Sequence, residues 1–156
     1  MLTNINCALA LSIMKNEIRA HGKVDVKVLG ISMMPTLKEE DIVTVSLPRK
    51  YKPGDIIIFM AHYEKMIIHR IISIEHGRFI TKGDNNKFFD EEFDTGTIVG
   101  KVDCWNRNGK IMCFSENCIL IKMLIYISHI EVKHPSAPII YSIKKRLLST
   151  CIRRIQ

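Results

Sequence analysis

Residues 54–72 read GDIIIFMAHYEKMIIHRII, and this stretch decides the fold. It contains one isoleucine-rich run over 55–60 and the start of a second run, which begins at Met66 and continues to Ile74. Runs of β-branched residues at this length favour strands, and the short polar segment between them favours an antiparallel hairpin. The sequence therefore predicts two neighbouring strands near the middle of the chain.

Similar short runs occur on both sides of this stretch, at 24–29, 41–46, 78–81 and 97–102. The segments between the runs are rich in turn-forming residues, as at Pro53-Gly54, at 83–86 and at 106–109. Regularly spaced strands with such turns are typical of an antiparallel sheet or barrel. We therefore expect a mostly β fold.

Helices are predicted at both ends of the chain. Ile5, Leu9 and Ile13 recur at four-residue spacing within 3–20, with Thr or Asn at positions 3 and 4 as the N-cap and Gly22 as the stop. An apolar segment follows residue 115 and runs to 130, and two prolines then separate it from a basic segment that begins at Ile139. This last segment is also expected to be helical.

Composition limits the class of protein. The chain has 156 residues with 47% hydrophobic content, which fits a single domain with a buried core. The net charge of +7 suits nucleic acid, anionic lipid or an acidic peptide, and charge alone does not choose among them. A helix-turn-helix, a zinc knuckle or an aromatic RNA-binding pattern would accompany nucleic-acid binding, and none is found, so no nucleic-acid partner is expected.

The cysteines and the apolar runs bear on location. Five cysteines occur without the spacing of a zinc site, and their odd number argues against a closed disulfide framework. We expect free thiols in a reducing compartment, with no metal and no cofactor. The longest apolar stretches are shorter than the ~20 residues that cross a bilayer, and the N-terminus does not have the pattern of a secretory signal. A cytoplasmic protein without a transmembrane anchor is expected.

Three segments contain candidate catalytic residues. In the first, GISMMPTL over 30–37, Ser32 follows an extended run and a glycine that permits close approach of a substrate backbone, and it could equally be a serine in a tight turn. In the second, His69 stands within an apolar strand, where burial favours a neutral ring that can accept a proton; a core histidine bonded to a carbonyl is the alternative. The third, over 79–86, contains Asp84, and Asp90 follows six residues later. Either carboxylate could orient the imidazole, whereas Asp84 could also simply cap a turn.

Taken together, these segments resemble the type I signal peptidase family. The resemblance spans about residues 24–102, and the serine motif, the strand 54–59 and the closing strand 98–102 follow the family's order. The bacterial branch has Lys before Arg at the position of the general base, whereas this chain has His69 before Arg70. The chain is therefore similar to the endoplasmic-reticulum and archaeal branch, which uses Ser and His with Asp.

The resemblance implies a fold and a site. It implies a coiled antiparallel sheet of the signal-peptidase catalytic type with N- and C-terminal helices, divided into a helix at 1–22, a peptidase core at 23–115 and a helical, basic segment at 116–156. Ser32 is then the nucleophile, His69 the base, and Asp84 or Asp90 the orienting group, with Asp90 slightly favoured. The substrate would lie as an added strand beside the Ser32 segment, which makes Gly30, Ile31, Met33 and Pro35 the substrate-binding positions.

The chain departs from the family at two positions near the serine. Many members have a serine two residues before the nucleophile as an oxyanion donor, and here that position is Gly30. The oxyanion hole is then expected to consist of backbone N–H groups, including that of Ser32. Glu40 stands where the family usually has glycine before Asp41, so the resemblance does not predict the geometry of that turn. The family's membrane anchor is also missing.

The C-terminal segment has a second candidate role. From Ile139 onward, apolar residues fall at three- and four-residue spacing up to position 155, and Lys144, Lys145, Arg146, Arg153 and Arg154 supply positive charge. A basic amphipathic helix of this kind suits an anionic membrane surface, which would make the enzyme a peripheral membrane protein. A helix that packs its apolar face on the sheet is the alternative.

These expectations define the function. We expect a serine endopeptidase that cleaves leader or signal peptides from a precursor peptide or protein, without a metal or cofactor. The absence of an anchor favours leader-peptide processing. The alternative is a catalytically silent relative that binds peptides or, like the repressors that share this catalytic fold, regulates transcription.

Overall fold

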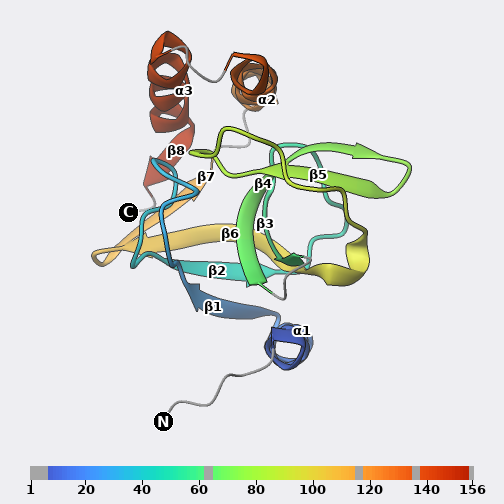
Figure 1. Ribbon diagram of the computed structural model, residues 1–156. Coiled ribbons are helices and arrows are strands. Elements are labelled where there is room, and N and C mark those ends of the chain that lie inside the picture. Colours follow the sequence, from blue (N-terminus) through green and yellow to red (C-terminus); the bar gives the residue numbers. More distant parts are fainter. Residues whose placement is uncertain (1–6, 62–64, 115–117, 135–137, 155–156) are drawn as a thin grey trace.

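The computed structural model describes residues 7–61, 65–114, 118–134 and 138–154. Their elements are, in chain order, α1 (Cys7–His21), β1 (Lys23–Lys27), β2 (Ile42–Ser46), β3 (Ile56–Ala61), β4 (Lys65–Glu75), β5 (Arg78–Lys82), the 3-10 helix η1 (Thr95–Thr97), β6 (Ile98–Arg107), β7 (Lys110–Phe114), α2 (Cys118–Lys133), α3 (Pro138–Cys151) and β8 (Ile152–Arg154). Figure 1 shows the strands in the middle of the molecule, with α1 at one end and the α2–α3 pair at the other.

The strands form one antiparallel sheet. Its order is β1-β2-β6-β3-β4-β5, and β7 and β8 extend it from β6. The register shifts within the β2–β6, β3–β6 and β4–β5 pairings. Such irregularities bend a strand and increase its twist, so the sheet coils instead of lying flat. The expected mostly β fold, a coiled antiparallel sheet with helices at both ends, is confirmed.

The six predicted strands correspond to β1 to β6, with small differences at their ends. The hairpin of 54–72 is present, and it pairs Ile57 with His69 and Ile56 with Arg70. β6 continues past the predicted end to Arg107, and β7 was not predicted. The turn between them uses Asn108 and Gly109, both at positive φ (53° and 78°), which is the backbone of a two-residue hairpin.

The predicted N-terminal helix is present as α1. It packs on the core through Ile18, which is buried, and through Leu11 and Met14 beside it, whereas Leu9 and Ile13 are 55% and 53% exposed. The four-residue spacing of Leu9 and Ile13 thus predicted the helix, but these two residues lie on its exposed side. The predicted stop is confirmed, because the N–H of Gly22, at φ +79°, bonds to the carbonyl of Ile18. Ile5 and the expected N-cap lie outside the described residues.

The C-terminal segment packs on the rest of the chain. α2 and α3 contact each other through buried residues, Leu124 from α2 and Leu148 and Cys151 from α3. α3 thus packs against α2, and the membrane contact expected for this segment stays a prediction. The prediction of one helix from 139 to the C-terminus is wrong: α3 ends at Cys151, and β8 pairs with β7. The assignment of Lys144 to a solvated basic face is also wrong, because only 2% of Lys144 is exposed.

Candidate functional site

Ser32 lies in the turn-rich segment that connects β1 to β2. Met33 and Leu37 on its far side are buried in the core, whereas Gly30 and Ile31 before it are exposed and Ser32 itself is half-buried. Met33 therefore anchors the segment from within, and the surface available to a substrate is formed by Gly30 and Ile31, with Pro35 half-buried beyond. Gly30 has a φ of +82°, a conformation that disfavours the serine found there in many signal peptidases.

Glu40 keeps its turn by adopting an unusual backbone conformation. Its φ of 74° lies in the left-handed region, where glycine is normally preferred. Its N–H bonds to the carbonyl of Val28, and its carboxylate pairs with Lys27 at 2.5 Å. Glu40 thus adopts in this turn the left-handed conformation that glycine adopts readily.

The segment of Ser32 is held against the turn at 83–86. The N–H of Asn85 donates to the carbonyl of Ser32 at 2.8 Å, and the side chain of Asn85 donates to the carbonyl of Ile31 at 3.3 Å. A Cβ on Gly83 would stand 2.7 Å from the Ser32 carbonyl oxygen, so only glycine permits this approach. We refer to residues 83–86 below as the site turn.

His69 lies on β4 and is 4% exposed. Its Nδ1 is 2.6 Å from Oδ2 of Asp90, and the hydroxyl of Thr81 donates to the same carboxylate oxygen at 2.6 Å. An ionised carboxylate only accepts hydrogen bonds, so Nδ1 is the donor in this contact, and in the neutral form of such a ring the lone pair lies on Nε2. Nδ2 of Asn86, in the site turn, is 3.5 Å from Nε2. The structure thus links His69 and Ser32 to the same turn, with the basic nitrogen on that side.

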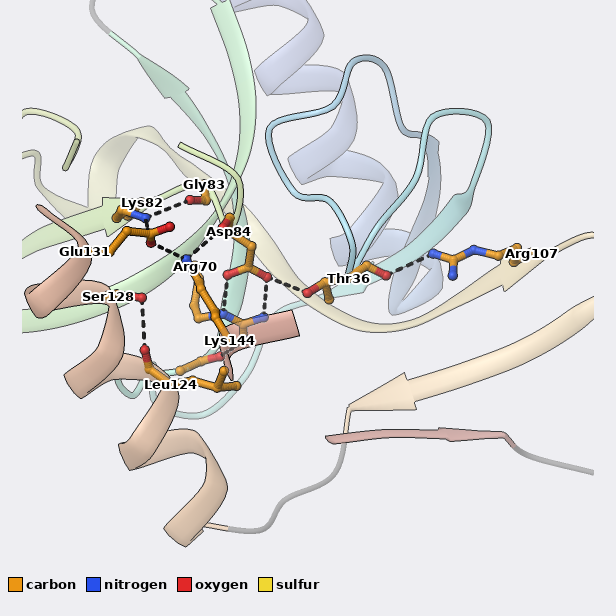
Figure 2. Close-up of polar contacts among 11 residues, drawn as sticks. Thr36, Arg70, Lys82, Gly83, Asp84, Arg107, Leu124, Ser128, Glu131 and Lys144 are labelled. Atoms are coloured by element: carbon orange, nitrogen blue, oxygen red, sulfur yellow. Dashed lines mark hydrogen bonds and ion pairs between the residues drawn. The ribbon is translucent and has the colours of Figure 1, made fainter. Parts of the chain in front are cut away.

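The two candidate aspartates have different partners. Successive residues of a strand point to opposite faces, so His69 and Arg70 face different ways from β4. Asp90 contacts His69, whereas Asp84 forms a bidentate pair with Arg70 at 2.8 and 2.7 Å and accepts from Thr36 at 2.5 Å. Figure 2 shows the Asp84 carboxylate directed at the guanidinium. Asp84 is therefore placed to hold the fold of the turn, and Asp90 to orient the imidazole.

The charge of Arg70 controls the ionisation of Asp84. Burial acts to raise the pKa of this carboxyl, but the charge and hydrogen bonds of Arg70, together with the charge of Lys144 and the hydrogen bond from Thr36, outweigh burial, and the pKa lies below its ordinary value. Arg70 also donates to the carbonyl of Gly54 at 2.8 Å and lies 4.4 Å from the ring centroid of Phe114. The pair thus connects the site turn to β4, to the turn before β3 and to β7.

Asp84→Asn is expected to lower the free energy of unfolding by about 3 kcal/mol or more, because it leaves the buried guanidinium of Arg70 without a counter-charge. Urea denaturation of the variant against the wild type measures this loss. Asp25→Asn, at an exposed position on β1, is the matched control and should change stability little. A variant of Asp84 as stable as that control would show that the pair does not hold the turn.

A second buried group of charges lies behind the site turn, and sequence reasoning missed it. Glu131 of α2 accepts from Lys82 of β5 and from Lys144 of α3, each at 2.7 Å. Lys144 also donates to the carbonyl of Asp84 at 2.7 Å. Figure 2 shows these side chains converging beside Arg70. No local pattern marks them, since the residues that meet are far apart in the chain.

Stability is expected to rise with pH because of Lys82. Burial, and then the charge of Lys144, lower the pKa of Lys82 to about 8. An unfolded lysine has a pKa of about 10.4, so between about pH 8 and 10 the unfolded chain binds more protons, and the free energy of unfolding increases with pH. Denaturation of wild type and Lys82→Met across this window isolates the contribution. The difference in stability between the two proteins should change over the window, and a constant difference would contradict the assignment.

A comparison with protein-family models agrees with this geometry. The model described as Peptidase S24-like matches residues 9–103. The matched region includes Ser32, His69, Asp84 and Asp90, and it ends before β7, α2 and α3. No curated protein matches the chain.

Proposed function

The chain belongs to the Peptidase S24-like family, which includes signal peptidase I and repressor-type members, and from this we propose that it is a serine endopeptidase. The observation that carries the proposal is the hydrogen bond from Nδ1 of His69 to Asp90, on a ring whose Nε2 faces the turn that holds Ser32. A histidine that donates from Nδ1 to a carboxylate presents the lone pair of Nε2 when the ring is neutral, which is the arrangement that a general base requires.

In the proposed mechanism, Nε2 of His69 takes the proton of the Ser32 hydroxyl as the oxygen attacks the scissile carbonyl. Asp90 holds the ring in place and stabilises its protonated form. Backbone N–H groups near Ser32 would stabilise the oxyanion, since Gly30 supplies no hydroxyl. His69 then protonates the leaving amine, and a water molecule, activated by the same nitrogen, releases the acyl group from Ser32.

The proposed substrate is an extended precursor peptide. The exposed Leu29, Gly30 and Ile31 precede the serine, and we refer to these three residues as the substrate strip. A peptide could add to the strip as a strand through backbone hydrogen bonds. Leader peptides and signal peptides both offer such an extended segment. Either class of precursor is therefore a proposed substrate.

The activity is tested with a library of peptides derived from cellular proteins. Incubation with the full chain should create new N-termini that mass spectrometry identifies, and the sequences before each cut define the preferred residues. The Ser32→Ala protein, handled identically, is the control. Equal numbers of cuts by both proteins, or none by either across libraries that include leader and signal peptides, would favour the silent or regulatory relative.

An anionic membrane surface is the proposed second partner. No helix in the described parts of the chain is long and apolar enough to span a bilayer. α2 has apolar side chains on its exposed face: Ile119 is 71%, Met123 45% and Tyr126 68% exposed. Lys122 and Lys133 are exposed on the same helix, and the chain carries a net charge of +7. Exposed apolar residues beside lysines suit a peripheral contact with anionic lipid.

Met123→Glu and Tyr126→Glu are expected to abolish sedimentation with phosphatidylserine vesicles at low salt, because they put negative charge on this face. Ile111→Glu, on β7, is the control for an exposed apolar position elsewhere, and it should leave sedimentation unchanged. Vesicles of neutral lipid should bind the wild type weakly. Unchanged sedimentation of both α2 variants, or no sedimentation of the wild type, would remove the membrane from the proposal.

A further inference from the structure

The site turn is held from two sides. On the side of the substrate strip, Asn85 N–H bonds to the carbonyl of Ser32. On the opposite side, Nζ of Lys144 bonds to the carbonyl of Asp84, the residue immediately before Asn85, at 2.7 Å. The Asp84 carbonyl and the Asn85 N–H belong to one peptide group, so the Lys144 ammonium on α3 and the Ser32 carbonyl bond to the two ends of the same peptide unit.

Lys144 is itself held in place. Its ammonium group bonds to Glu131, which also accepts from Lys82, and the side chains of both lysines are almost completely buried. A flexible lysine that bonds a carbonyl from the surface would contribute little to positioning. Here the hydrogen bond to Glu131 and the burial restrict the side chain. Figure 2 shows its ammonium group bonded to both Glu131 and the Asp84 carbonyl.

Burying charged side chains between a helix and a sheet costs desolvation free energy. Apolar side chains of similar volume often stabilise such a contact equally well or better. What an apolar side chain would not provide at position 144 is a hydrogen bond to the Asp84 carbonyl. The ammonium group thus has a consequence for the geometry of the turn that packing alone does not have.

We propose that Lys144 is a positioning residue, which fixes the site turn and through it the backbone of Ser32, and that Glu131 anchors it. The expected effect of Lys144 on turnover rests on the proposed function, whereas its expected effect on the geometry of the site turn does not depend on that function. It assigns a role in the site to α2 and α3, which lie outside the residues that the family model matches.

Lys144→Met keeps the stem and removes the ammonium group, and Lys145→Met changes the exposed neighbouring lysine as the matched control. Hydrogen exchange at the amides of Asn85 and Asn86 should accelerate about tenfold or more in Lys144→Met, because a charge-assisted hydrogen bond to the turn is lost. Amides of β3 should exchange as in the wild type, and so should every amide of the control. This measurement needs no substrate.

Turnover provides the second readout. The kcat of Lys144→Met on a cleaved peptide should fall about tenfold to a hundredfold with little change in KM, because the serine is misplaced while the substrate strip is intact. Lys144→Arg, which retains charge and donors, should recover part of the loss. A role in stability alone would lower the unfolding midpoint but leave wild-type exchange at the turn and wild-type kcat in the folded protein, and that result would overturn the proposal.

Should Lys144→Met fail to fold, Glu131→Gln tests the same inference. It retains an oxygen acceptor but removes the charge that anchors Lys144, so the amides of Asn85 and Asn86 should still exchange faster than in the wild type. Unchanged exchange at these amides would contradict the proposal. Absence of cleavage by the wild type, together with faster exchange in the variants, would reject the peptidase function and keep the positioning role.

Discussion

Ser32→Ala is expected to lower the turnover number on a cleaved precursor peptide by at least about a thousandfold, because the serine oxygen forms the covalent bond to the substrate. His69→Ala should cause a loss of similar size, since the two side chains act as one proton-transfer unit. Steady-state cleavage, followed by chromatography, measures both.

The folded structure should survive the change at position 32. Ser32 is half-buried, and its link to the site turn uses its main-chain carbonyl, which alanine keeps. Denaturation midpoints within error of the wild type would show that the lost activity is chemical. Turnover of the Ser32→Ala protein at the wild-type rate would end the serine-peptidase interpretation.

Asp90→Asn is expected to lower turnover by about a hundredfold or more, because an amide at this position can donate to Nδ1 and so favours the tautomer with a protonated Nε2. That ring cannot accept the proton of Ser32. The change is isosteric, and cleavage rates of the folded variant measure it directly. The turnover of folded Asp84→Asn should fall less, since Asp84 contacts Arg70 and Thr36.

Glu92→Gln, which removes an exposed carboxylate close by in the chain, is the control for loss of negative charge near the site. It should retain the wild-type rate. Wild-type turnover in Asp90→Asn as well would remove the aspartate from the mechanism and leave His69 as the base without an orienting group.

The strands were predictable because their signal is local. β3 and β4 are rich in isoleucine, and each has four consecutive buried residues, so both were visible as apolar runs in the sequence. β7 was missed although the Asn108-Gly109 pair, a strong hairpin signal, precedes it. β8 has only three residues and follows α3 directly. Its strand conformation depends on pairing with β7, which the local sequence does not indicate.

Residues of the site were predictable where a motif surrounds them, and not where distant segments meet. The sequence left Asp84 and Asp90 as alternatives. Both residues follow β5 closely in the chain, so either could fold back to contact β4. His69 and Arg70 point to opposite faces of β4, so Asp90 contacts one and Asp84 contacts the other. Which aspartate meets His69 therefore depends on the face of the sheet that carries the site. Lys144 looked like one surface charge among several basic residues. Its burial depends on Glu131 and on the Asp84 carbonyl, which only the packing of α2 and α3 brings together.

The most direct test of the central claim is to locate the covalent intermediate. An activated ester of a cleaved peptide is mixed with the full chain, the reaction is quenched in acid within milliseconds to seconds, and the digested protein is analysed by mass spectrometry. We predict an acyl group on the hydroxyl of Ser32, which is absent in Ser32→Ala and accumulates more slowly in His69→Ala. Hydrolysis of the ester without acylation of Ser32, or acylation of another residue at the rate of turnover, would contradict the account.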